Sequence, residues 1–143
     1  MSRTLFGLSI LQLGEWVAAL IAAAIMLQTL FFKFSAAEES VYIFSTLGAE
    51  PWGRIGSGVV ELVASLLLVY PRTRWIGAFL GLGTMLGAIL AHVIILGIVV
   101  QDDGGQLFLY ALLVFACCAY CLFMEKEVVF SKGKQVWNSL VAK

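Results

Sequence analysis

Two ionisable residues lie well inside the apolar stretches of this chain, where a charge is costly. Glu61 follows Arg54 by seven residues, about 10 Å along an α-helix, and His92 precedes Gln101 by nine residues, about 13 Å by the same rise. If the two stretches cross a membrane in opposite directions, the two side chains lie at similar depth below the same surface. The residues that could form one ligand-binding or proton-handling site there are Glu61, His92, Lys33 at the end of the first stretch, and Gln28 below it.

A carboxylate in hydrocarbon costs about 2.5–3.5 kcal/mol, so Glu61 should face the interior of a helix bundle and be paired or protonated. One interpretation is structural: Glu61 pairs with Lys33 or His92 and ties helices together. Interhelical polar contacts average only about 0.6 kcal/mol, however, and functional use is the default for an acid inside a membrane. We favour binding or proton handling, with Glu61 and Lys33 paired and His92 as a nearby hydrogen-bonding partner.

The chain holds a single histidine, with no second ligand at a suitable spacing, which argues against haem or a closed zinc site. Cys118 and Cys121 form a CxxC pair beside Cys117, and this spacing is also found in redox dithiols. The pair stands at the C-terminal end of a predicted helix, where the helix dipole disfavours a thiolate. We therefore favour cysteines that only pack, and we predict no metal site.

These residues are positioned by four apolar stretches, each near the ~20 residues that a helix needs to cross a bilayer. The chain is 62% hydrophobic and only 13% charged, with a mean hydropathy of +0.99, whereas soluble domains are about a quarter charged. Continuous apolar runs also exclude the alternating pattern of a β-barrel. We predict an all-α integral membrane four-helix bundle, a single transmembrane domain over 1–143, with spans at about 16–34, 55–70, 75–100 and 107–124.

Basic residues are unevenly shared between the two ends of such a bundle. Seven fall on one side and two on the other, and the excess predicts that both termini are cytoplasmic in a cell membrane, with a bacterial inner membrane expected. The connection 35–54 should contain a short helix on the outer surface. The tail 125–143 is amphipathic and should lie on membrane lipid of the cytoplasmic face. The seven are Arg3, Arg72, Arg74, Lys126, Lys132, Lys134 and Lys143, and the two are Lys33 and Arg54.

Small residues in the third stretch form two rows with a spacing of four. Such rows let helices in lipid approach closely, so the third span should be central, in contact with two neighbours. The rows would also suit a homo-oligomer. They are Gly77 with Gly81, and Gly83 with Gly87 and Ala91.

Three stretches resemble the DoxX and DoxX-like family of small four-helix membrane proteins. They are FFKF at 31–34, GSGVVELVASLLLVYPRTRWIGA at 56–78 and TMLGAILAH at 84–92. The family pattern has a Lys near the end of the first span, a Glu in a Gly-x-x-E-L setting, an Arg after the following turn and, in one branch, an Ala-x-x-x-His. Lys33, Glu61, Arg74 and His92 match these positions, and the resemblance covers roughly 11–123.

The resemblance implies a fold more firmly than an activity. Members of the family include a membrane subunit of a thiosulfate:quinone oxidoreductase, a maturation protein for an amine dehydrogenase, and receptor chaperones. We expect a membrane component of a redox or oxidative-stress system, working with a membrane or redox partner protein, whose cofactor or ligand is a quinone or bound lipid near Glu61, His92 and Lys33. The alternatives are a non-catalytic chaperone or assembly partner and a small-solute or proton carrier. Whether the chain is an enzyme stays open, and no phosphate loop or nucleic-acid module is present.

Overall fold

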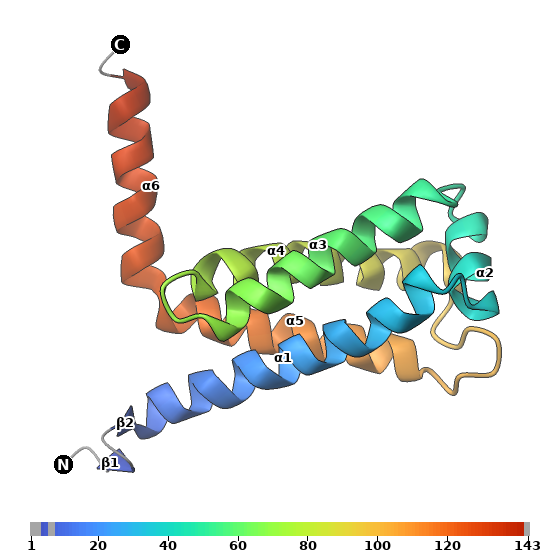
Figure 1. Cartoon of the computed structure of the whole chain (residues 1–143), viewed down its shortest axis with the longest axis horizontal. Helices are drawn as coiled ribbons and strands as arrows, with labels where there is room; N and C mark the ends of the chain where they lie inside the picture. The colour runs from blue at the N-terminus through green and yellow to red at the C-terminus, as the bar shows by residue number, and fades with distance from the viewer. Residues whose placement is uncertain (1–3, 6–7, 142–143) are drawn as a thin grey trace.

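The computed structural model describes residues 4–5 and 8–141, and in this part of the chain almost every element is a helix (Figure 1). A two-residue antiparallel pair precedes the helices. The elements are β1 (Thr4–Leu5), β2 (Leu8–Ser9), α1 (Ile10–Phe34), α2 (Glu38–Thr46), α3 (Trp52–Val69), α4 (Arg74–Ala91), the π-helix η1 (His92–Leu96), α5 (Gln106–Met124) and α6 (Lys126–Val141).

Four of the helical segments are long and apolar enough to cross a membrane, which confirms the predicted all-α four-helix architecture. They are Ile10–Phe34, Trp52–Val69, Arg74–Leu96 and Gln106–Met124. The packing is a four-membered ring, because α1 and α4 each lie against both α3 and α5. The third span has the two neighbours that were predicted, but α1 has the same two, so the third span is not uniquely central.

Two helix ends differ from the predicted spans by four residues or more. The first helix begins at Ile10 instead of Trp16, because Ser9 and Gln12 form a reciprocal capping box at its N-terminus. The third ends at Leu96 instead of Val100, because its last turn is a π-helix closed by Gly97, whose φ of 82° is readily available only to glycine.

Close packing in the half of the bundle near α6 depends on small side chains. A Cβ atom added to Gly77 would lie 2.5 Å from the backbone N of Leu68, and one added to Gly81 would lie 2.8 Å from Cys118 Sγ. Gly83 and Gly87 differ, since nothing lies within 4 Å of an added Cβ at either position. The first predicted row therefore contacts α3 and α5, whereas Gly87 and Ala91 line a cavity.

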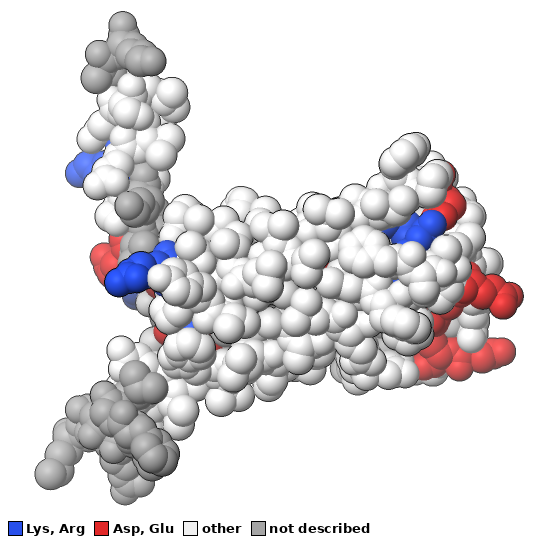
Figure 2. All heavy atoms as spheres, viewed as in Figure 1, with Lys and Arg blue, Asp and Glu red and all other residues white. Residues whose placement is uncertain are grey.

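The two ends of the bundle are built differently. Helix α2 lies across one end, and α6 leaves the other end roughly at right angles to the long axis of the bundle (Figure 1). Acidic side chains gather at the α2 end (Figure 2). Several large apolar side chains of α6 are exposed, namely Phe130, Val136, Trp137, Leu140 and Val141.

Candidate functional site

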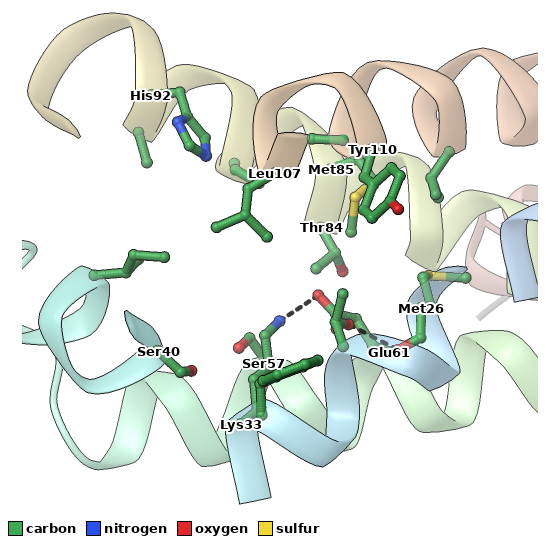
Figure 3. Close-up of a pocket in the computed structure, with 18 of the residues that line it drawn as sticks. Met26, Lys33, Ser40, Ser57, Glu61, Thr84, Met85, His92, Leu107 and Tyr110 are labelled. Carbon is green, nitrogen blue, oxygen red and sulfur yellow. Dashed lines mark hydrogen bonds and ion pairs between the residues drawn. The ribbon is translucent and has the colours of Figure 1, made fainter. Parts of the chain in front are cut away.

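A cavity of about 410 Å³ lies among the four spans, in the half of the bundle nearest α2 (Figure 3). Its volume falls in the range of small-molecule sites, and most of its lining is apolar. Residues of α2 close one side of it, among them Ser40 and Phe44. All four residues that the sequence singled out line this one cavity: Gln28, Lys33, Glu61 and His92.

The expected ion pair between Lys33 and Glu61 is present in the cavity wall. Lys33 Nζ lies 2.5 Å from Glu61 Oε1, and the Glu61 residue is only 2% exposed. The Thr29 hydroxyl donates to Glu61 Oε2 at 3.0 Å. The same hydroxyl lies 2.8 Å from the carbonyl oxygen of Met26, so its one proton is shared between two acceptors. Each carboxylate oxygen thus has a donor group within reach, as a buried pair needs to offset its desolvation.

Two residues that support this pair were not identified from the sequence. Thr29 lies four residues before Lys33, one helical turn away, so its position on the same face of α1 could have indicated it. Arg54 donates through Nη1 to the carbonyl oxygen of Lys33, and through Nη2 to Glu50 Oε1 at 2.7 Å. Arg54 thereby fastens the end of α1 to the start of α3.

His92 stands on another wall of the cavity, and its partner is not the predicted one. The ring Nδ1 donates to the carbonyl oxygen of Gly97 at 2.8 Å, and the ring lies edge-on to Phe108 with centroids 5.6 Å apart. In the described part of the chain no hydrogen bond joins His92 to Glu61. The π-turn brings the carbonyl oxygen of Gly97 against the ring of His92. The prediction assumed a regular α-helix, in which this contact does not form.

Two acids lie where α2 and the α4–α5 connection meet the cavity. Burial raises the pKa of Glu39, and the nearby Asp103 raises it further. Burial alone would also raise the pKa of Asp103, but hydrogen bonds from the backbone N–H groups of Leu107, Val100 and Gly105 bring it below its ordinary value. Asp103 is thus an ionised cap that holds the start of α5 in place.

A second buried ion pair, at the α6 end, was not predicted. Glu15 Oε1 lies 3.2 Å from Arg74 Nη1, the guanidinium stacks 4.1 Å from the centre of the Trp16 ring, and Arg74 Nε donates to Leu68 O. The residues Glu15 and Arg74 are 8% and 3% exposed. In the sequence Glu15 directly precedes Trp16 and Arg74 belongs to a basic turn, and nothing in their spacing indicates that the two pair.

Glu125, the residue that follows α5, has a pKa that depends on this second pair. Burial, a hydrogen bond with Glu15 and the charge of Glu15 together raise the pKa of Glu125 to about 7. Because this pKa exceeds the ordinary 4.5, folding favours the protonated acid, and stability should be full below about pH 4.5 and decline as the pH rises through 7.

We expect the decline to be on the order of 1 kcal/mol, since solvent screens this half-buried group. Thermal unfolding of the wild type and of Glu125→Gln between pH 5 and 8 measures it. The variant should have a flatter profile, whereas parallel profiles for the two proteins would contradict the assignment.

The three cysteines are free thiols, and all three are buried. Cys121 donates a long hydrogen bond of 3.8 Å to the carbonyl oxygen of Glu15. Within the residues that the structure describes, no group of three His, Cys, Asp or Glu side chains is placed to hold a metal ion. The polar groups that line the cavity include the Lys33–Glu61 ion pair, the imidazole of His92 and the hydroxyl groups of Thr29 and Thr84.

Comparison of the chain with family models, with curated proteins and with solved structures finds no match.

Proposed function

We propose that this chain is a DoxX-like protein of a cell membrane that binds a small, mainly apolar ligand, quinone-like or lipid, beside Lys33 and Glu61. It would serve as a membrane component of a redox or oxidative-stress system. The observation that carries the proposal is that a buried ion pair forms part of the wall of a cavity of about 410 Å³. A few polar groups that converge on a mainly apolar cavity are typical of a small-molecule site.

The composition of the cavity supports a ligand with an apolar body and a polar head. Its apolar lining includes Ile25, Met85 and Val114, while the polar groups are few and converge from different helices. Lys33 and Glu61 come from α1 and α3, and His92 reaches in from the wall opposite them (Figure 3). A ring or chain could occupy the centre while its polar atoms meet these groups.

The charge distribution supports an orientation with the α6 end in the cytoplasm. Seven of the nine basic residues fall in the sequence segments that precede the first span, join the second to the third and follow the fourth. The positive-inside rule assigns these segments to the cytoplasm. In this orientation α2 lies on the outer surface above the cavity. Helix α6, at right angles to the spans, would lie along the cytoplasmic surface, with its exposed apolar side chains in lipid.

The test is native mass spectrometry of the protein taken from its own membrane in lipid nanodiscs. We expect the wild type to carry a bound small molecule, and Glu61→Gln to lose most of it. Glu15→Gln is the matched control, because it removes the same kind of charge from the buried pair outside the cavity lining and should retain the ligand.

Equal occupancy in the wild type and in Glu61→Gln would contradict the proposal. If instead a stoichiometric protein copurified and no small molecule did, an assembly or chaperone role would replace it.

A further inference from the structure

The ring of His92 is fixed by a closed pair of hydrogen bonds with Gly97. The backbone N–H of Gly97 donates to the carbonyl oxygen of His92 at 2.8 Å, and Nδ1 of the ring meets the carbonyl oxygen of Gly97, also at 2.8 Å. A carbonyl oxygen can only accept, so the proton must be on Nδ1. The π-helix and the positive φ of Gly97 create this arrangement, and π-turns are frequent at functional sites.

The other ring nitrogen, Nε2, has no recorded partner among the described residues, and His92 points into the cavity (Figure 3). Asp103 is a nearby acid, but both oxygens of its carboxylate accept backbone N–H groups. His92 is 5% exposed and lies against Phe108. An uncharged ring with its proton on Nδ1 presents Nε2 to the cavity as a hydrogen-bond acceptor.

The opposite wall supplies the complementary group. The ammonium of Lys33 has three protons and gives one to Glu61 Oε1. Nζ makes no other hydrogen bond within the part of the chain that the structure describes, so its remaining protons can meet an acceptor on a ligand. The cavity therefore offers an acceptor at His92 and a donor at Lys33, with apolar side chains between them.

We infer that this cavity selects a ligand that presents an O–H or N–H group to Nε2 of His92, so that a dihydroxy aromatic ring binds in preference to the corresponding dione. The inference rests on the proposed function and specifies the ligand of that same site. One hydroxyl group of the ring can donate to Nε2 of His92. The hydroxyl group on the opposite side of the ring can accept from Lys33. A dione carries two acceptors and would face the imidazole acceptor without a proton between them.

The tautomer can be measured directly, because the chain contains one histidine. Untagged protein labelled with ¹⁵N-histidine in nanodiscs should give one protonated and one unprotonated ring nitrogen. The pattern of couplings to the two ring C–H groups should identify Nε2 as the unprotonated one. A protonated Nε2, either in the other tautomer or in a charged ring, would overturn the inference.

The ligand preference is tested with tetramethylhydroquinone and tetramethylbenzoquinone under oxygen-free conditions. We expect the wild type to bind the hydroquinone more tightly by roughly three- to tenfold, the effect of one added hydrogen bond. The ratio should fall to about one in His92→Phe, which keeps the ring shape without the acceptor.

Equal affinities in the wild type, or tighter binding of the dione, would overturn the inference while leaving the proposed function intact. Failure of both probes to bind would also overturn the inference, because the dihydroxy ring that it names would not enter the cavity. The proposed function would then still be decided separately, by the native ligand carried by the wild type and by Glu61→Gln.

Discussion

Replacing Lys33 by methionine should lower the free energy of unfolding by about 3–5 kcal/mol, the cost of breaking a buried ion pair. The substitution strands the carboxylate of Glu61, which is 2% exposed and keeps, among the described residues, only the Thr29 hydroxyl as a donor. Thermal unfolding in one detergent at neutral pH measures the change. The effect should be among the largest of any single substitution in the chain.

The double variant Lys33→Met with Glu61→Gln separates the stranded charge from lost packing. Once the acid is neutral, no uncompensated charge remains, and the double variant should recover most of the stability lost in Lys33→Met. Comparable unfolding temperatures for the wild type, Lys33→Met and Glu61→Gln would show that the pair is not the buried, charged contact described above.

Gly77→Ala should destabilise the bundle by about 1–3 kcal/mol, the usual range for overpacking. The added Cβ would lie 2.5 Å from Leu68 N and 2.7 Å from Ala64 O, which are backbone atoms that cannot rotate away. To make room, α4 must move away from α3 and disturb the hairpin that the two helices form. Thermal unfolding of the variant and the wild type measures the loss.

Gly83→Ala is the matched control on the same helix. Nothing lies within 4 Å of the added Cβ, so the change should be silent or stabilise α4 by up to about 1 kcal/mol through helix propensity. An equal loss of stability in both glycine variants would contradict the packing of α3 on α4.

The sequence was sufficient for the features that depend on hydrophobicity and helical rise. Charge-free runs near 20 residues predicted four helices. Counting along the helices placed Glu61 and His92 at a similar depth. The position of Lys33 at the end of the first stretch led to the predicted pair with Glu61, which is present. The glycine rows were only partly informative. Gly83 follows Gly77 by six residues and lies on another face of α4, and the spacing of small residues alone does not say which face meets a neighbour.

The features that the sequence did not reveal depend on local backbone departures and on contacts distant in the chain. The π-turn after Ala91 redirects His92 to Gly97, and a prediction that assumes a regular α-helix extends that span to Val100 instead. Glu15, Arg74 and Glu125 are far apart in sequence, and each has an ordinary interpretation as an interfacial charge. Only the packing of α1, α4 and α5 shows that they meet.

The most direct test of the ligand site is a high-resolution experimental density map of the protein isolated from its native membrane. We predict continuous non-protein density in the cavity between Lys33 and His92, with a polar atom within hydrogen-bonding distance of His92 Nε2. A cavity that contains only ordered water, or that the side chains of Phe44 and Met85 fill, would contradict the account.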